Sequence, residues 1–437
     1  MATSKRIAYN ARITLSFDYE NEHIPIDTMN IAYLYIDSSY VANVLPIIYL
    51  GLLVNDTLYN KIVEYKSTGS FTVDIKKFSV NKKQTTTGKS ILKDHFSYLL
   101  STNTANFMQD LNEASPNKGE DMKRQILIGL ISKEMTNKLR KSFNGVYNNV
   151  SESTLVSLAL EGTNPVIERL TTNKNYKSII IPPLATRYQL LKYVFDKDPF
   201  YSTQFIMFMD FNRTYLLSQN GKKVSAEDGK PDSVLIKVNS IMSNASYFEG
   251  MSVADDHYYI DIAPTDIKIL SNDSSNKMVD NVTIIDENNN ISNLDIDYDD
   301  QTKGLNSKQV IVRSNNPELL KNTLESNQVR VQVVKSYIDG SVFTPNKTYN
   351  LINDKGNEQF DGLYILENKQ EVFKPTVDDF QMSVVLTLRK VGKMNQATVS
   401  KSGQLQYKKS INKAVTSSGK RSTTAALRTQ ANTRKAN

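Results

Sequence analysis

The sequence predicts an α+β fold that is mainly β. Segments that alternate apolar and polar residues with period 2 occur toward both ends of the 437-residue chain, for example at residues 12–18. Turn signals such as Asp339-Gly340 and Asp361-Gly362 separate the later segments, and apolar residues at helical spacing dominate one long stretch, between residues 91 and 170. Short strands that are separated by such turns indicate a barrel or a sandwich.

Residues 1–85 are predicted to form a first β unit with one short helix. Strands are expected at 12–18, 29–37, 45–54 and 71–78, and a helix at 55–65, where Leu58, Ile62 and Tyr65 share one face. Residues 81–90 are polar and read as a linker. Residues 86–178 are then predicted to be a mostly helical insertion, with apolar residues at helical spacing over 91–100 and 122–143 and a helix at 151–160 capped by Ser151.

Residues 179–232 are predicted to be a small α/β unit. A strand at 179–183 ends at two prolines, a helix follows at 185–195, and residues 205–218 form a hairpin whose first strand is apolar enough to be buried on both faces. Residues 233–393 form a second β unit, and residues 394–437, which lack apolar periodicity, form a disordered basic tail. The strands expected in the second β unit are 234–238, 258–262, 328–338, 348–352, 363–367 and 381–388.

The charge is concentrated at the C-terminal end. No acidic residue follows Asp379, whereas twelve Lys and Arg residues lie between Arg389 and Lys435, which leaves a net charge of −5 on the preceding body. The tail suits phosphates or an acidic protein surface, but a solvated terminus explains it equally well. Its one aromatic residue, Tyr407, gives little support for base stacking.

The composition excludes several classes of site. The chain has no Cys and three well-separated His residues, so disulfides, zinc–thiolate sites and thiol catalysis are ruled out. No apolar run reaches the ~18 residues of a membrane-spanning helix, so no membrane insertion is expected. The N-terminus shows no signal peptide.

Two segments resemble ligand-binding loops in part. Thr85 to Ser90 ends like a phosphate-binding loop, but the required Gly five residues before Gly88 is Lys83, so a polar linker is preferred. Asp295 to Asp300 has the alternating carboxylates of a calcium loop but lacks the Gly at its sixth position and the Glu at its twelfth. A solvated acidic loop is preferred there, with a weak cation site left open.

Two further clusters contain residue types that could serve in catalysis. Asp255, Asp256 and His257 offer a possible general base, but no nucleophile motif accompanies them and a turn is the better interpretation. Glu20, Glu22 and His23 lie in the first turn, where a lysozyme-like carboxylate pair has no specific support. The prediction is therefore a protein with no catalytic, cofactor-binding or metal residues, no cofactor, and no enzymatic activity.

Three passages carry a resemblance to a known family. They are the opening β unit up to residues 45–54, the stretch from Ile181-Pro182-Pro183-Leu184 through residues 205–218, and the ending from Gly362 to Leu388. Across residues 10–80 and 179–390 the chain resembles the baseplate hub proteins of contractile-tailed bacteriophages. The segment 91–170 and the basic tail lie outside this resemblance.

The resemblance implies two tube-like β-barrel domains, here residues 1–85 and 233–393, in each subunit of a homotrimer. The resulting pseudo-sixfold ring joins the tail tube protein to the central spike protein, contacts other baseplate proteins, and lets DNA pass transiently through its lumen. It implies a place in the virion tail baseplate after synthesis in the host cytoplasm, and no catalytic residues. Two alternatives remain: a tube-initiating or distal tail adaptor with a single barrel, and a cell-wall hydrolase with its site near His257 or within 91–170.

Truncation at Asn395 tests the predicted tail. Exposed ion pairs contribute only ~0–1 kcal/mol each and are screened by salt, so attachment of the tail to an acidic surface should be cumulative. We expect the truncated protein to fold and to bind its partner more weakly in moderate salt, measured by pull-down across a salt series. Failure to fold would show that the tail belongs to a core.

Overall fold

The computed structural model describes most of the chain before residue 393, as 8–40, 44–80, 88–100, 124–184, 186–219, 233–238, 251–254, 257–272, 281–285, 291–295, 309–313, 329–353 and 361–392. The chain divides into two units, residues 1–391 and 392–437. The predicted basic tail, residues 394–437, lies outside the described residues. The prediction of an α+β, mainly β fold is confirmed.

Eight strands of the large sheet close on themselves and enclose the first core. Their order is β22-β3-β4-β7-β6-β5-β1-β23, and pairing of β22 with β23 completes the circuit. In β1 the side chains of Ala11, Ile13, Leu15 and Phe17 alternate inward, as a half-buried strand requires. The bounds are β1 Tyr9–Tyr19, β3 Ile31–Ser39, β4 Ile47–Val54, β5 Ser70–Ser79, β6 Lys89–Leu100, β7 Arg124–Ser132, β22 Gly362–Pro375 and β23 Phe380–Gly392. Strand β2 (Glu22–Ile26) pairs with β1, and helix α1 (Asp56–Glu64) confirms the predicted helix.

The prediction of helices over 91–100 and within 122–132 is wrong, because these segments are β6 and β7. Leu92 and Phe96 are both buried, but a spacing of four fits the period of a strand as well as that of a helix. Phe96 and Tyr98 are both buried although they are two residues apart, which places them on one face of a strand but on nearly opposite faces of a helix, and Leu99 is 63% exposed. The first circuit therefore draws on residues 9–132 and on the C-terminal hairpin, so its strands are not confined to residues 1–85.

The second β region continues from the same hairpin. Strands follow in the order β14-β15-β13-β21-β22 on one side and β23-β20-β16 on the other. The pairings of β13 with β15 and with β21 are parallel, whereas β14–β15, β16–β20, β20–β23 and β21–β22 pair in antiparallel fashion. The bounds are β13 Ser233–Val238, β14 Ser252–Ala254, β15 His257–Ile262, β16 Ile267–Asn272, β20 Val329–Ser336 and β21 Thr348–Asn353. A separate three-stranded sheet consists of β17 Asn281–Ile285, β18 Ile291–Asp295 and β19 Gln309–Arg313.

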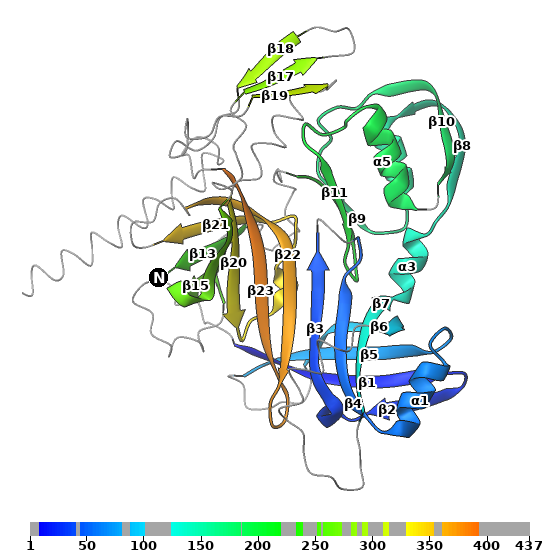
Figure 1. Cartoon of the computed structure of the whole chain (residues 1–437), viewed down its shortest axis with the longest axis vertical. Helices are drawn as coiled ribbons and strands as arrows, with labels where there is room; N and C mark the ends of the chain where they lie inside the picture. Colours follow the sequence, from blue (N-terminus) through cyan, green and yellow to red (C-terminus); the bar gives the residue numbers. More distant parts are fainter. Residues whose placement is uncertain are drawn as a thin grey trace, which may run out of the picture. The chain divides into compact units, whose positions relative to one another are not determined.

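One long hairpin therefore serves both β regions (Figure 1, β22 and β23). Phe373 and Phe380, near its turn, lie in the first core. Tyr364 and Leu366 of β22 and Leu386 of β23 lie in the second core. The two cores are thus built on the same pair of strands rather than on two separate chain segments.

A third core lies in the segment between the two β regions. It contains helices α3 (Lys133–Leu139), α4 (Glu152–Leu160) and α5 (Arg187–Lys197), the ribbon of β8 (Phe143–Ser151) and β10 (Asn175–Leu184), and a small sheet of β9 (Pro165–Ile167), β11 (Phe205–Met209) and β12 (Thr214–Ser218). The predicted helices at 151–160 and 185–195 are confirmed, with Ser151 and Thr186 as their N-caps. The prediction that prolines end the strand at 183 is wrong, since β10 continues to Leu184.

Strand β11 is buried on both faces, as its apolar sequence predicts. Met207 and Met209 pack into the third core, whereas Phe208 packs into the second and meets the ring of Tyr40 at 4.3 Å between centroids. Beyond the strand, the ring of Phe211 packs against the ring of Phe96 in the first core, with 5.9 Å between the ring centroids. This hairpin therefore touches all three cores.

Replacement of Phe373 by Ala tests whether the shared hairpin makes the β regions one cooperative unit. The side chain is 1% exposed, and the cavity should lower the free energy of unfolding by ~3–5 kcal/mol. We expect a single, shifted denaturant transition by both tyrosine fluorescence and circular dichroism. The control is Val377→Ala, at a residue that is 98% exposed. This change should alter the free energy of unfolding by less than ~0.5 kcal/mol. Two separate transitions would show independent β regions.

Candidate functional site

The loops that the sequence singled out for ligands do not assemble a site in the described residues. Lys89 and Ser90 begin strand β6, whereas a phosphate-binding loop requires a helix at this point. Asp295 ends strand β18, and residues 296–300 lie outside the description. His257 begins β15 opposite Ser233, and the adjacent Asp255 and Asp256 are also outside it. Among the described residues, no group of three or more His, Asp or Glu side chains is placed to hold a metal ion.

The first turn uses its charged residues in surface pairs. Glu22 accepts a hydrogen bond from Tyr19 and pairs with Lys61 at 3.1 Å, and these contacts lower the pKa of the Glu22 carboxyl. Glu20 occupies the turn itself, with φ of 49°. A general acid of the lysozyme type needs a raised pKa, so this environment opposes that role for Glu22.

A line of polar side chains that the sequence did not reveal crosses four strands nearby. His23 Nδ1 lies 2.5 Å from Asp18 Oδ1, Thr72 donates to Asp18 Oδ2 at 2.5 Å, and Thr72 Oγ1 lies 2.8 Å from His95 Nδ1. Because an ionised carboxylate only accepts, Asp18 orients both His23 and Thr72. Burial raises the pKa of Asp18, but the hydrogen bonds from Thr72 and His23 outweigh it and the net shift is downward. The line ties β2, β1, β5 and β6 together.

Buried charges concentrate where the shared hairpin passes between the cores. Arg389 of β23 is 1% exposed and donates to Glu367 of β22 at 2.6 Å and to the backbone oxygen of Gln219 at 2.5 Å. Glu367 also accepts from Arg330 of β20 at 2.8 Å. Burial lowers the pKa of Arg389, against the attraction of Glu367. Arg389 and Lys390 open the run of basic residues that follows Asp379, and both belong to β23 and are buried.

A second charged cluster lies further along the same hairpin. Lys77 of β5 pairs with the buried Asp339, and Lys369 of β22 pairs with Glu371 at 3.1 Å. Lys369 also donates to the backbone oxygen of Gly340 at 3.1 Å. A Cβ at Gly340 would lie within 2.6 Å of three atoms of the Glu371 side chain, so any other residue here would displace Glu371 from its position beside Lys369. The cluster holds β5, the turn at 339–342 and β22 in fixed register.

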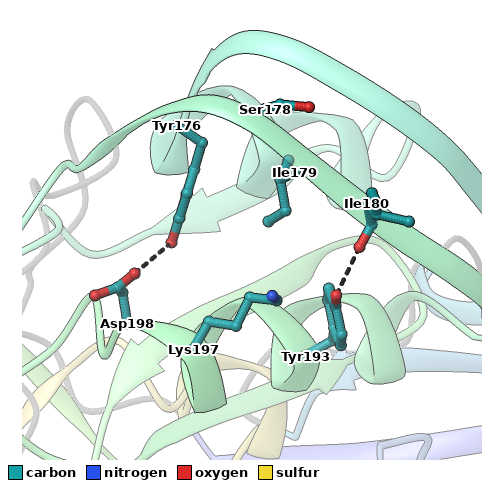
Figure 2. Close-up of a pocket in the computed structure, with 7 residues that line it drawn as sticks. All are labelled: Tyr176, Ser178, Ile179, Ile180, Tyr193, Lys197 and Asp198. Carbon is teal, nitrogen blue, oxygen red and sulfur yellow. Dashed lines mark hydrogen bonds between the residues drawn. The ribbon is translucent and has the colours of Figure 1, made fainter.

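An open pocket of about 620 Å³ lies between β10 and helix α5 (Figure 2). The Tyr176 hydroxyl donates to Asp198 at 3.1 Å, and the Tyr193 hydroxyl donates to the backbone oxygen of Ile180 at 2.6 Å. These two bonds join the strand to the helix on either side of the pocket. Lys197 reaches between them, with its ammonium 5.1 Å from the centroid of the Tyr193 ring.

Solved structures similar to this chain include two tail proteins. The tail protein from Neisseria meningitidis is 10% identical over 87% of this chain and 97% of its own, with a TM-score of 0.45. The 43 kDa tail protein of prophage MuSo2 from Shewanella oneidensis has the same identity and coverage, with a TM-score of 0.49. A chain of the Francisella PdpA–VgrG complex is 10% identical to this chain. The match covers 91% of this chain and 61% of that one, with a TM-score of 0.46. No family model and no curated protein matches the sequence.

Replacement of Glu367 by Gln tests the buried ion pair at the hairpin. Removing one partner leaves the Arg389 charge buried and unpaired, which should lower the free energy of unfolding by ~3–5 kcal/mol in urea denaturation. The matched control is Glu161→Gln, in an exposed and solvent-screened pair with Lys141, where little or no change is expected. Equal effects of the two changes would contradict a special role for the buried pair.

Proposed function

We propose that this chain is a structural hub of a phage tail baseplate, which forms a homotrimeric pseudo-sixfold ring between the tail tube and the central spike. The observation that carries the proposal is the sharing of one long hairpin by two β regions, one of them a closed eight-stranded circuit. Two such regions in each of three subunits would offer six similar units to a sixfold tube and a threefold face to a spike. The sequence resemblance to hub proteins supports the same assignment.

The other expected partners follow from this role. The ring would contact the tail tube protein, the central spike protein and other baseplate proteins, and it would reside in the virion tail. The body before Arg389 carries a net charge of −5, which would favour a lumen through which DNA slides without adhering. Among the described residues, no helix has the length and apolar character needed to cross a bilayer.

Both alternatives have less support from the molecule. A single-barrel adaptor does not account for the second β region built on the hairpin. A cell-wall hydrolase is not favoured by any described cluster, since contacts lower the pKa of Glu22 rather than raise it. Clearing of a peptidoglycan zymogram that is lost on His257→Ala would nevertheless overturn the structural assignment.

The mass of the purified protein in solution tests the trimer. We expect about 148 kDa by light scattering coupled to size exclusion, three times the 49.4 kDa of one chain. The measurement is repeated at several micromolar concentrations and with the spike protein added, because assembly could depend on it. A stable monomer under all these conditions would contradict the proposed ring.

A further inference from the structure

One outward face of the eight-stranded circuit is apolar. In β4 and β7 alternate side chains point into the first core, and most of those between them, which point outward, are apolar as well. Such continuous apolar runs are typical of strands that are covered on both sides. Strand β3 lies beside β4 (Figure 1) and adds two outward tyrosines. The tyrosine face consists of these partly exposed residues: Tyr33, Tyr35, Ile47, Tyr49, Leu53, Leu127, Gly129 and Ile131.

The tyrosines of this face form a continuous stack. The rings of Tyr35 and Tyr49 stack with 4.8 Å between their centroids, and those of Tyr33 and Tyr35 stack at 6.0 Å. A Cβ at Gly51 would lie within 2.9 Å of three atoms of the Tyr33 ring, so this ring covers the backbone of β4. Burial raises the pKa of the Tyr33 and Tyr35 phenols, which keeps both side chains uncharged at neutral pH. The tyrosine face is therefore ordered and has no charge at its centre.

Gly129 lies in the middle of the tyrosine face, between Tyr49 of β4 and Leu99 of β6. Glycine in the interior of a strand weakens it and often marks a place where another chain approaches closely. Among the described residues, a Cβ at Gly129 would meet only the Ile47 side chain, at 3.7 Å, which is an ordinary contact distance. The packing of this chain therefore does not explain the glycine, whereas a neighbouring molecule on the face would.

The other outward face of the same circuit is polar. The outward side chains of β1, β5 and β6 include Arg12, Thr14, Asp18, Thr72, Asp74, Lys76, Lys93 and His95. Asp18, Thr72 and His95 belong to the hydrogen-bonded line described above. One side of the circuit thus suits water, so the apolar character of the tyrosine face is not a general property of its exterior.

The size and composition of the tyrosine face suit a permanent interface. With Val372 of β22 and Leu99 of β6 at its sides it spans five neighbouring strands, which at ~4.8 Å spacing and ~20 Å of strand length give ~400 Å². That is half of the ~800 Å² that each partner buries in a standard interface. Charged residues lie at the margin, with Asp37 near the end of β3 and Arg124 at the start of β7. An apolar centre with a polar rim is typical of contacts between copies of one chain, which are more apolar than contacts between partners that separate.

We propose that the tyrosine face is the surface through which one copy of this chain packs on the next copy. This inference rests on the proposed function, because a closed ring requires each subunit to bury a surface against its neighbour. In such a ring the contact is heterologous, so the tyrosine face of one copy meets a different surface of the next. Gly129 leaves the room into which a side chain of the neighbouring copy fits.

The first test compares Gly129→Arg with Thr14→Arg, which places the same side chain on the polar face of the circuit. Light scattering across a dilution series gives the dissociation constant of the assembly, under the conditions in which the unchanged protein associates. We expect Gly129→Arg to raise this constant at least about tenfold and Thr14→Arg to leave it unchanged, with both variants folded by circular dichroism. An associating protein in which the two variants behave alike would overturn this inference and leave the ring in place. A protein that stays monomeric under all conditions would overturn both proposals.

The second test does not depend on whether Gly129→Arg folds. Because the chain has no Cys, Leu99→Cys, at a residue 63% exposed beside Gly129, can be labelled at a single position with a benzophenone maleimide. We expect irradiation to join copies of the chain covalently, whereas the same label on Thr14→Cys should not. Mass spectrometry of the product identifies the surface of the neighbouring copy. Products from both labelled positions, or from neither, in an associating protein would overturn the assignment of the tyrosine face.

Discussion

The pairing of β22 with β23 is the interaction on which the rest of the structure depends. It closes the eight-stranded circuit around the first core and, further from the turn, supplies strands to the second β region. Phe373 near the turn and Leu366 nearer the start of β22 belong to different cores, although they lie only seven positions apart on one strand. Loss of this pairing would open both cores, because neither has another strand pair that could replace it within the described sheet.

The buried charges of the hairpin fit this shared use. An ion pair such as Arg389–Glu367 contributes little net stability, because desolvation offsets the attraction. The pair does penalise a wrong register of β23. A slip by one residue would turn every side chain of the strand to the opposite face, and it would leave Arg389 buried without Glu367. The Lys369–Glu371 pair and the glycine at 340 impose a second condition a short distance along the same strand.

The β11–β12 hairpin connects the third core to the other two. Its two faces pack on different cores, and Met209 donates a backbone hydrogen bond to Val44 at 2.7 Å. The ribbon of β8 and β10 belongs to this third core, and its Ile180 and Val146 side chains stay exposed.

The sequence by itself determined the mainly β class, the helices at 55–65, 151–160 and 185–195, and the burial of 205–209, because periodicity and capping are local properties. It did not separate strand from helix at Leu92 and Phe96, since a spacing of four suits both, and pairing with neighbouring strands decided the outcome. Only the tertiary structure could reveal the Asp18–Thr72–His95 line, the burial of Arg389, and the pocket at Lys197. Each of these joins residues from different elements, and the register that brings them together is set by long-range strand pairing and packing rather than by neighbours in the chain.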